Sequence, residues 1–246
     1  MQIWLGTARW LSGMLLGLAV IVPSAAAQRL DRADRLAAPV RAPSEWAVDV
    51  MLATAVPTVL GGNVRIETPG RFLIDVLVGG NPYADTLGSL VEAYGGGVPA
   101  HQFVTAIGQS AGIMRLQVGW RPTPDAGLEI LAGYSLIYSS PTISRPTLES
   151  VTGQSFAYAG FDSTQLQVAI HGVTAELGWR FVIADHLVLR LGIGGTFTVG
   201  SSAHLAVPDA MREASPAVAT AEGEIAGSIA RYGFVPEARV ALGYRF

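Results

Sequence analysis

The 246-residue chain contains no cysteine and no lysine, so all 16 of its basic residues are arginine. Without cysteine there can be no disulfide, no thiolate zinc or iron–sulfur site and no lipidated N-terminal cysteine. Without lysine there can be no lysine Schiff base, no P-loop lysine and no lysine general base. The net charge of −3 gives no basic footprint for nucleic acid.

Charge of either sign is scarce, because Asp, Glu, Lys and Arg make up 14% of the residues, whereas 50% are hydrophobic and 29 are glycine. A typical soluble domain is about one quarter charged. The low charge and the mean hydropathy of +0.39 argue against disorder and against an ordinary solvated surface. Beyond residue 27 no stretch of 18 apolar residues is free of charges and glycine clusters. Any membrane crossing there must therefore be made by strands.

The first 27 residues have the three-part pattern of a secretory signal peptide. Arg9 supplies the positive region, residues 11–22 form an apolar run, and three alanines at 25–27 provide a small-residue cleavage site. An uncleaved anchor helix is the alternative, but a membrane span needs about 20 apolar residues. We therefore expect a signal peptide at 1–27 and export from the cytoplasm. The polar, proline-containing segment 28–44 is interpreted as a linker, and residues 45–246 as one domain.

From Trp46 onward, apolar and polar residues alternate with a period of two, which predicts strands rather than helices. Within 166–181 the alternation changes phase near His171 and Gly172, which predicts a bulge there. Eight strands are predicted in all, at 46–53, 60–67, 72–78, 114–121, 128–136, 166–181, 187–197 and 239–246.

The two faces of these strands differ in kind. One face is almost wholly aliphatic or aromatic, whereas the other is rich in glycine and carries five acids and seven arginines. Such a set suits a narrow polar interior in which ions pair and small residues make room. The predicted interior network consists of Asp49, Arg65, Glu67, Asp75, Arg115, Arg121, Glu129, Glu176, Arg180, Arg190, Arg239 and Arg245.

The connections between the predicted strands alternate in length. Those after the second, fourth and sixth strands are short, whereas those near 80–111, 139–164 and 200–231 are long. Short turns at one end and long loops at the other are typical of bacterial outer-membrane barrels. Within the long loops, 82–94 and 215–231 have helical character, and a helix or loop precedes Ser110.

An apolar–Gly–aromatic–Arg motif recurs at the ends of the fourth, sixth and eighth predicted strands, beginning at Val118, Leu177 and Leu242. The predicted topology brings these three strand ends to one rim. Their aromatic residues, Trp120, Trp179 and Tyr244, would then form an interfacial aromatic girdle.

The last seven residues, VALGYRF, resemble the C-terminal strand signature of Gram-negative outer-membrane barrels. With eight predicted strands, the chain resembles the small barrels of the OmpA/OmpX and opacity-protein type. The resemblance implies an all-β, eight-stranded antiparallel up-and-down barrel in the outer membrane, surrounded by lipid and lipopolysaccharide. It also implies that the barrel-assembly machinery reads Leu242, Tyr244 and Phe246 during biogenesis.

Candidates for catalysis are weak. Ser110 lies in a G-x-S-x-G sequence, but a nucleophile elbow needs a strand before the serine and a helix after it, and the order here is the reverse. Ser202 and His204 lie close together in a long loop without a positioned third group. The remaining histidines, His101, His171 and His186, show no metal-ligand spacing. No cofactor or metal is expected.

These observations favour a non-enzymatic outer-membrane barrel with a structural or surface-interaction role, whose lumen is plugged by the arginine–acid network. Eight strands leave an interior only wide enough for side chains. Two alternatives stay open at this point. One is a small pore for anionic solutes, which would need ten or more strands, and the other is an outer-membrane lipid hydrolase that uses Ser110 or Ser202 with a histidine.

Overall fold

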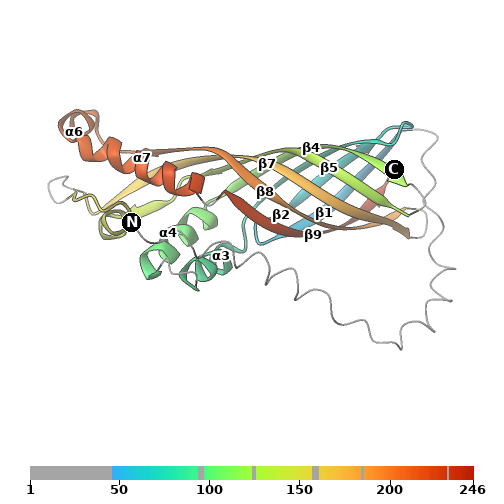
Figure 1. Ribbon diagram of the computed structural model, residues 1–246, viewed down its shortest axis with the longest axis horizontal. Helices are drawn as coiled ribbons and strands as arrows, with labels where there is room; N and C mark the ends of the chain where they lie inside the picture. The colour runs from blue at the N-terminus through green and yellow to red at the C-terminus, as the bar shows by residue number, and fades with distance from the viewer. Residues whose placement is uncertain (1–45, 94–96, 124–125, 157–160, 184–185, 232) are drawn as a thin grey trace. The chain divides into compact units, whose positions relative to one another are not determined.

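The chain folds into a closed antiparallel barrel, seen in a computed structural model that describes residues 46–93, 97–123, 126–156, 161–183, 186–231 and 233–246 (Figure 1). The expected signal peptide and linker lie outside these residues. Eight strands pair in the order β5-β4-β3-β2-β1-β9-β8-β7, and β7 closes the barrel on β5. The eight-stranded antiparallel barrel is thus confirmed. The strands are β1 (Ala47–Val56), β2 (Val59–Glu67), β3 (Phe72–Gly80), β4 (Gly112–Thr123), β5 (Leu128–Ser139), β7 (Ser163–Ile183), β8 (Leu187–Leu205) and β9 (Phe234–Arg245).

The strand register fixes the tilt of the barrel. We start at Ala47 and move from each residue to its pairing partner on the next strand. One circuit of the eight strands ends at Glu237 on β9. When the register of β9 with β1 is continued by one residue, Glu237 falls opposite position 57. The row therefore climbs ten residues in one circuit. For eight strands this stagger corresponds to a tilt of about 40° and an interior that side chains can fill.

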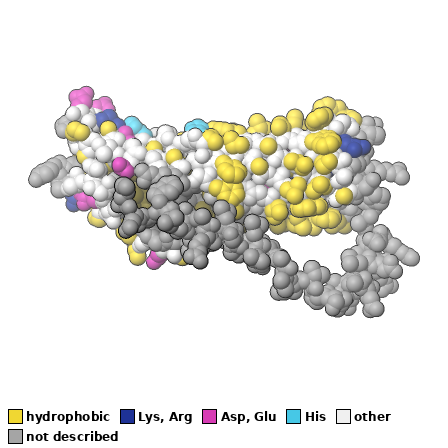
Figure 2. Space-filling view, in the orientation of Figure 1, with side chains coloured by type: hydrophobic (Ala, Val, Ile, Leu, Met, Phe, Trp, Pro, Cys, Tyr) yellow, Lys and Arg dark blue, Asp and Glu magenta, His cyan; other side chains and the backbone are white. Residues whose placement is uncertain are grey.

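The strand alternation is inverted relative to that of a water-soluble protein. Apolar residues point outward along every strand and are well exposed, for example Val50 (47%), Leu116 (47%) and Val240 (44%), whereas Arg65 and Arg190 point inward and are fully buried. Figure 2 shows the outward apolar side chains crowded over the strands, away from α6 and α7. We call this outward surface the apolar band.

The two ends of the barrel differ in their connections. At one end, β2 joins β3, β4 joins β5 and β7 joins β8 by short turns. At the other end, β1 and β2 are joined by Pro57 and Thr58 alone, whereas the other three connections are long and contain helices. These helices are α3 (Ala84–Val91), α4 (Gly97–Gln109), α5 (Arg145–Thr152), α6 (Asp209–Ala214) and α7 (Pro216–Arg231), with a short strand β6 (Thr142–Ser144) paired to β7. No helix among the described residues is long and apolar enough to span a membrane.

Two of these helices were predicted. Helix α3 lies within the expected segment 82–94, and α7 nearly coincides with 215–231. Helix α5, which is as short as α3, was not predicted. Its boundaries are nonetheless marked in the sequence, since Ser144 caps its N-terminus, a proline follows in the first turn, and Gly153 ends it with φ = 68°.

The helices and the outer ends of β7 and β8 form what we call the cap, which has a hydrophobic core of its own. Its buried residues come from α4, β6, α5, β7, β8 and α7 and from the segment that follows α5. In this part of the chain the apolar side chains point inward, as they do in a water-soluble domain. The core consists of Phe103, Ile143, Leu148, Phe156, Leu166, Val168, Leu205, Val218, Ala221 and Ile225.

The transition from barrel to cap coincides with the bulge predicted from the sequence. The register of β7 with β8 shifts between His171 and Gly172, because Gly172 pairs with Thr198 and His171 with Gly200. The extra residue is therefore Val199 on β8, whereas β7 keeps its phase throughout. From the barrel toward the cap, the inward positions of β7 change from polar to apolar. The change of phase predicted from the sequence is therefore a change in the type of residue at the inward positions and not a change in which positions point inward.

Candidate functional site

The inward face of the barrel is the candidate site, and all twelve charged residues predicted for it point into the lumen. Eleven are buried, and the side chain of Arg245 is 15% exposed. The structure adds a thirteenth member, Glu237, which the sequence prediction missed because the strand was expected to begin at 239. Its odd-numbered position continues the inward alternation of Arg239 and Arg245, which was the available signal.

At the short-turn end, two carboxylates bind three arginines. Arg121 Nη1 lies 2.8 Å from Glu67 Oε1, and Arg180 Nη1 lies 2.7 Å from Glu67 Oε2. Arg180 also reaches Asp49 at 3.3 Å, and Arg245 reaches Asp49 at 3.2 Å and Glu67 at 2.5 Å. Arg245 and Asp49 lie on the neighbouring strands β9 and β1, whereas the other pairs join strands that are not neighbours in the barrel wall.

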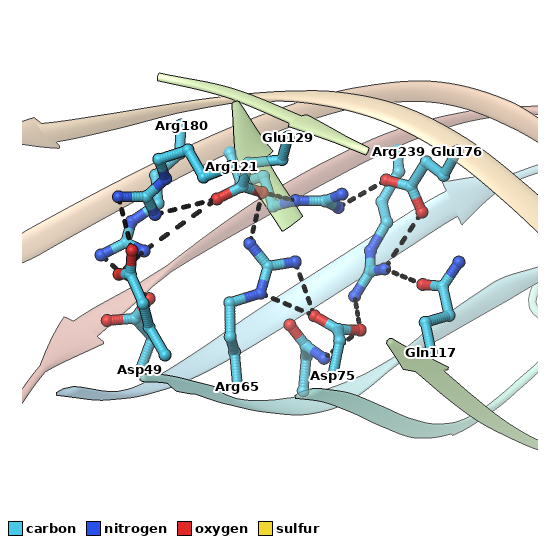
Figure 3. A network of polar contacts seen from close by, with 12 residues as sticks. Asp49, Arg65, Asp75, Gln117, Arg121, Glu129, Glu176, Arg180 and Arg239 are labelled. Atoms are coloured by element: carbon cyan, nitrogen blue, oxygen red, sulfur yellow. Dashed lines mark hydrogen bonds and ion pairs between the residues drawn. The ribbon is translucent and has the colours of Figure 1, made fainter. Parts of the chain in front are cut away.

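Glu129 is the central hub of the network (Figure 3). Its Oε2 accepts hydrogen bonds from Arg65 Nη1 at 2.6 Å and Arg190 Nε at 2.9 Å, and its Oε1 accepts one from Arg121 Nη2 at 3.2 Å. Arg65 also donates to Asp75 from Nε and Nη2, at 3.0 and 2.7 Å. One carboxylate on β5 is thereby bound by arginines from β2, β4 and β8.

Toward the cap, Arg239 and Arg115 continue the network. Arg239 pairs with Asp75 at 3.0 Å and Glu176 at 3.3 Å, and donates to Gln117 Oε1 at 3.0 Å. Arg115 pairs with Glu237 at 2.7 Å. Ion pairs therefore run along the lumen from the short-turn end to the cap end.

Thr58 closes the cap end of this network. Its hydroxyl donates to Glu237 Oε1 at 2.8 Å, which ties the β1–β2 turn to β9. The sequence gives no sign that Thr58 takes part, because it lies in a turn and carries no charge.

Glycines provide the space that these long side chains occupy. A Cβ atom on Gly178 would lie 2.7 Å from Arg190 Nη2, and a Cβ on Gly192 would overlap Glu176 Oε1. Glycines on the polar face were predicted to make room in this way. A gap lined by Arg115, Gln117 and Glu237, among others, leaves no volume in which a water molecule fits.

The arrangement can cross-link the barrel walls, but it offers little room for chemistry. Seven arginines face six carboxylates, so each charge has opposite charges around it and the net charge of the set is small. No group of three or more His, Asp or Glu residues suited to a metal ion occurs in the described parts of the chain.

The serines considered for catalysis are not assembled with histidines. Ser110 follows α4 and precedes β4, and its hydroxyl bonds the Ser139 hydroxyl at 2.6 Å. Ser202 and His204 both point outward from β8. Within the described ranges, no hydrogen bond joins Ser110 or Ser202 to a histidine.

Each histidine has another partner. His101 pairs with Glu92 at 2.6 Å, His171 bonds the Tyr134 hydroxyl, and His204 lies 3.4 Å from Glu222. His186 lies 3.2 Å from the backbone oxygen of Arg245 and stacks on Tyr244, with ring centroids 5.0 Å apart.

The residues predicted for the aromatic girdle and for the assembly signal all lie on the outward face near the short-turn end. Trp120 is 46% exposed and Trp179 is partly exposed. Tyr244 contacts Phe246 edge-on, with ring centroids 4.9 Å apart, and Leu242 is well exposed. Their placement is the one expected, whereas their roles at a membrane surface and in assembly stay predictions.

No protein-family model and no curated protein matches the chain. Among solved structures it is similar to CarO of Acinetobacter baumannii, with 13% identity over 85% of this chain and 98% of that chain and a TM-score of 0.39. It is also similar to the N-terminal β-barrel domain of OprF of Pseudomonas aeruginosa, with 9% identity over 82% of this chain and 96% of that chain and a TM-score of 0.39. The barrel fold is established by the strand order and register of this chain itself.

Proposed function

We propose that the protein is a non-enzymatic outer-membrane barrel with a closed lumen, whose role is structural or is to present the cap at the cell surface. The main support for the proposal is that the polarity of the inward and outward positions reverses between the barrel and the cap. In the barrel, apolar side chains point outward and charges inward, whereas in the cap the core is apolar. A chain that passes from lipid into water has this pattern.

The extent of the apolar band fits a membrane. On β8 the outward apolar residues run from Leu187 to Phe197, and both are more than 40% exposed. Ten residues at about 3.3 Å each, tilted by about 40°, span roughly 25 Å, which is the height of the lipid-facing surface of outer-membrane barrels. A monomeric soluble protein rarely exposes a contiguous apolar surface of this size.

The lumen supports a plug rather than a pore. The anion-pore alternative needed ten or more strands, and the barrel closes with eight. The arginines that would select anions are bound to carboxylates at 2.5–3.3 Å, so they are not free to bind anions passing through the lumen. The hydrolase alternative has no support from the positions of Ser110 and Ser202.

Two measurements test the proposal. We expect the protein to fractionate with outer membranes and to migrate as a compact form on gels until heated. In planar bilayers we expect no steady conductance from the native protein. A triple variant, Arg65→Ala, Glu129→Ala and Arg190→Ala, empties the centre of the lumen and should conduct.

Large, regular conductance steps from the native protein would overturn the plug. A native protein that stays monomeric and folded in buffer without detergent would overturn the membrane location.

A further inference from the structure

The outward wall directly above the apolar band has a composition of its own. On β5, β7 and β8 it carries Tyr138, Gln167, His171, Ser202 and His204, of which all but the partly buried His171 are exposed. Figure 2 shows the apolar band giving way to polar and histidine side chains toward α6 and α7. We call these five residues the polar strip.

The strand register brings the members of the polar strip together. Ala169 lies between Tyr138 on β5 and Ser202 on β8, as the partner of both. In the rows on either side, His171 pairs with Gly200 and Gln167 with His204. The five side chains thus surround two small residues, Ala169 and Gly200.

The wall is open above Gly200, because a Cβ atom placed there would meet nothing within 4 Å. The Tyr134 hydroxyl bonds His171, which is the register partner of Gly200. At this level the outward face therefore has little side-chain bulk at Ala169 and Gly200, with the two tyrosines on β5 on the other side of β7 from Gly200.

The chemistry of the polar strip fits a sugar better than a phosphate. Amide, hydroxyl and imidazole groups both donate and accept hydrogen bonds, as sugar hydroxyls do, and tyrosine rings pack against apolar faces. Phosphate recognition in proteins relies mainly on arginine or lysine. Arg212 lies beside the strip, with its Nη2 3.4 Å from His204, but it is already bound to Glu222 through two hydrogen bonds of 3.0 Å.

We propose that the polar strip binds the sugar headgroups of glycolipids in the outer leaflet of the surrounding membrane. This proposal rests on the proposed outer-membrane location. The strip is continuous with the apolar band, since Val173, Phe197 and Val199 are exposed apolar residues next to it, and β7 and β8 stay paired for several residues beyond them. A headgroup whose acyl chains contact the band would meet the strip next. Beyond the bulge at Val199, Ser202 and His204 point outward and complete it.

The test uses the full-length mature chain in phospholipid nanodiscs. The probe is the deacylated, dephosphorylated core oligosaccharide of lipopolysaccharide, and binding is followed by saturation-transfer NMR. We expect native protein to bind the probe and Gly200→Phe, which covers the open wall above Gly200, to bind it about tenfold more weakly, a change that corresponds to about 1.4 kcal/mol. The matched control is Gly223→Phe on the exposed face of α7, where a Cβ also meets nothing within 4 Å. It should bind like the native protein.

Three outcomes would overturn the proposal. They are the absence of binding by native protein, equal binding by Gly200→Phe, and binding only of an oligosaccharide that retains its phosphates. If Gly200→Phe fails to fold, the double variant Gln167→Leu and His204→Leu replaces it and should show the same loss. If the native protein inserts into the nanodiscs and shifts on heating but does not bind the probe, only the sugar-binding proposal is refuted. A failure to insert would instead refute the proposed location.

Discussion

Arg65 Nη1 lies 2.6 Å from Glu129 Oε2, although β2 and β5 are separated in the barrel wall by β3 and β4. Both side chains are fully buried. The pair therefore connects opposite parts of the wall through the lumen rather than neighbouring strands along it. Charges that lie far from water need such partners, because an unpaired buried ion is costly.

Replacing Arg65 by methionine should destabilise the barrel by about 3–5 kcal/mol, because it removes the one cation that bridges the buried carboxylates of Glu129 and Asp75 and leaves each with fewer opposite charges. The free energy of unfolding in phospholipid vesicles can be measured by urea titration. Adding Glu129→Gln to the variant should recover part of the loss. Arg71→Asn is the control, since Arg71 lies in a short turn with φ = 67°, which asparagine tolerates, and it should change stability by less than about 0.5 kcal/mol. Equal losses for Arg65→Met and Arg71→Asn would contradict the bridging role.

The lumen glycines give a second prediction. Gly192→Val should destabilise the barrel by about 1–3 kcal/mol, because its Cβ would overlap the carboxylate of Glu176 and force it from Arg190. The matched control is Gly62→Val on β2, an outward position where a Cβ meets nothing within 4 Å. We expect that control to be neutral or slightly stabilising, since valine favours strands. Urea midpoints of the two variants compare them directly, and a Gly62→Val loss as large as that of Gly192→Val would refute the packing argument.

The eight strands and the twelve inward charges could be predicted because both follow from a period of two, which is visible in the sequence. Glu237 was missed because Pro236 interrupts that pattern at the start of β9. The partners across the lumen could not be predicted, since alternation shows that Arg65 and Glu129 face inward but not that they lie at one height. Height depends on the stagger of the strands, which is a property of the closed barrel.

The cap was less visible for a different reason. The inward positions of β7 are apolar at Leu166 and Val168 and polar from Thr174 onward, so one strand carries two opposite patterns. Read alone, that sequence predicts a change of phase. Only the pairing with β8 shows that the extra residue lies on the other strand.

Deletion of Val199 tests the function of this bulge. Without Val199, Thr198 and Gly200 become consecutive and can keep their pairs with Gly172 and His171 in a regular ladder. Ser202 and His204 then still point outward, and Leu205 stays in the cap core. We expect the cap of this variant to resist limited proteolysis as the native cap does, and the barrel to shift on heating. A cap that becomes sensitive to proteolysis would show that the extra residue itself, rather than the pairing on either side of it, holds the cap in place.

The attachment of α6 and α7 to β8 should depend on pH through Glu222. Its carboxylate accepts two hydrogen bonds of 3.0 Å from Arg212 and one of 2.7 Å from the backbone N–H of Leu205. Burial alone would raise the pKa of Glu222, but these hydrogen bonds hold it below the ordinary value. His204, 3.4 Å away, adds a positive charge when it is protonated and acts in the same direction.

A carboxylate with a lowered pKa in the folded state stabilises that state fully above its unfolded pKa of about 4.3, and the stabilisation is lost as pH falls through the folded value. Hydrogen exchange of α6 and α7, expressed as protection factors, should therefore decrease on acidification below about pH 4. Glu222→Gln should show lower protection at neutral pH and little further change with acid, because the amide does not titrate. If native protein and Glu222→Gln lose protection in parallel, the acid response of the cap arises from another carboxylate, and Glu222 is not its anchor.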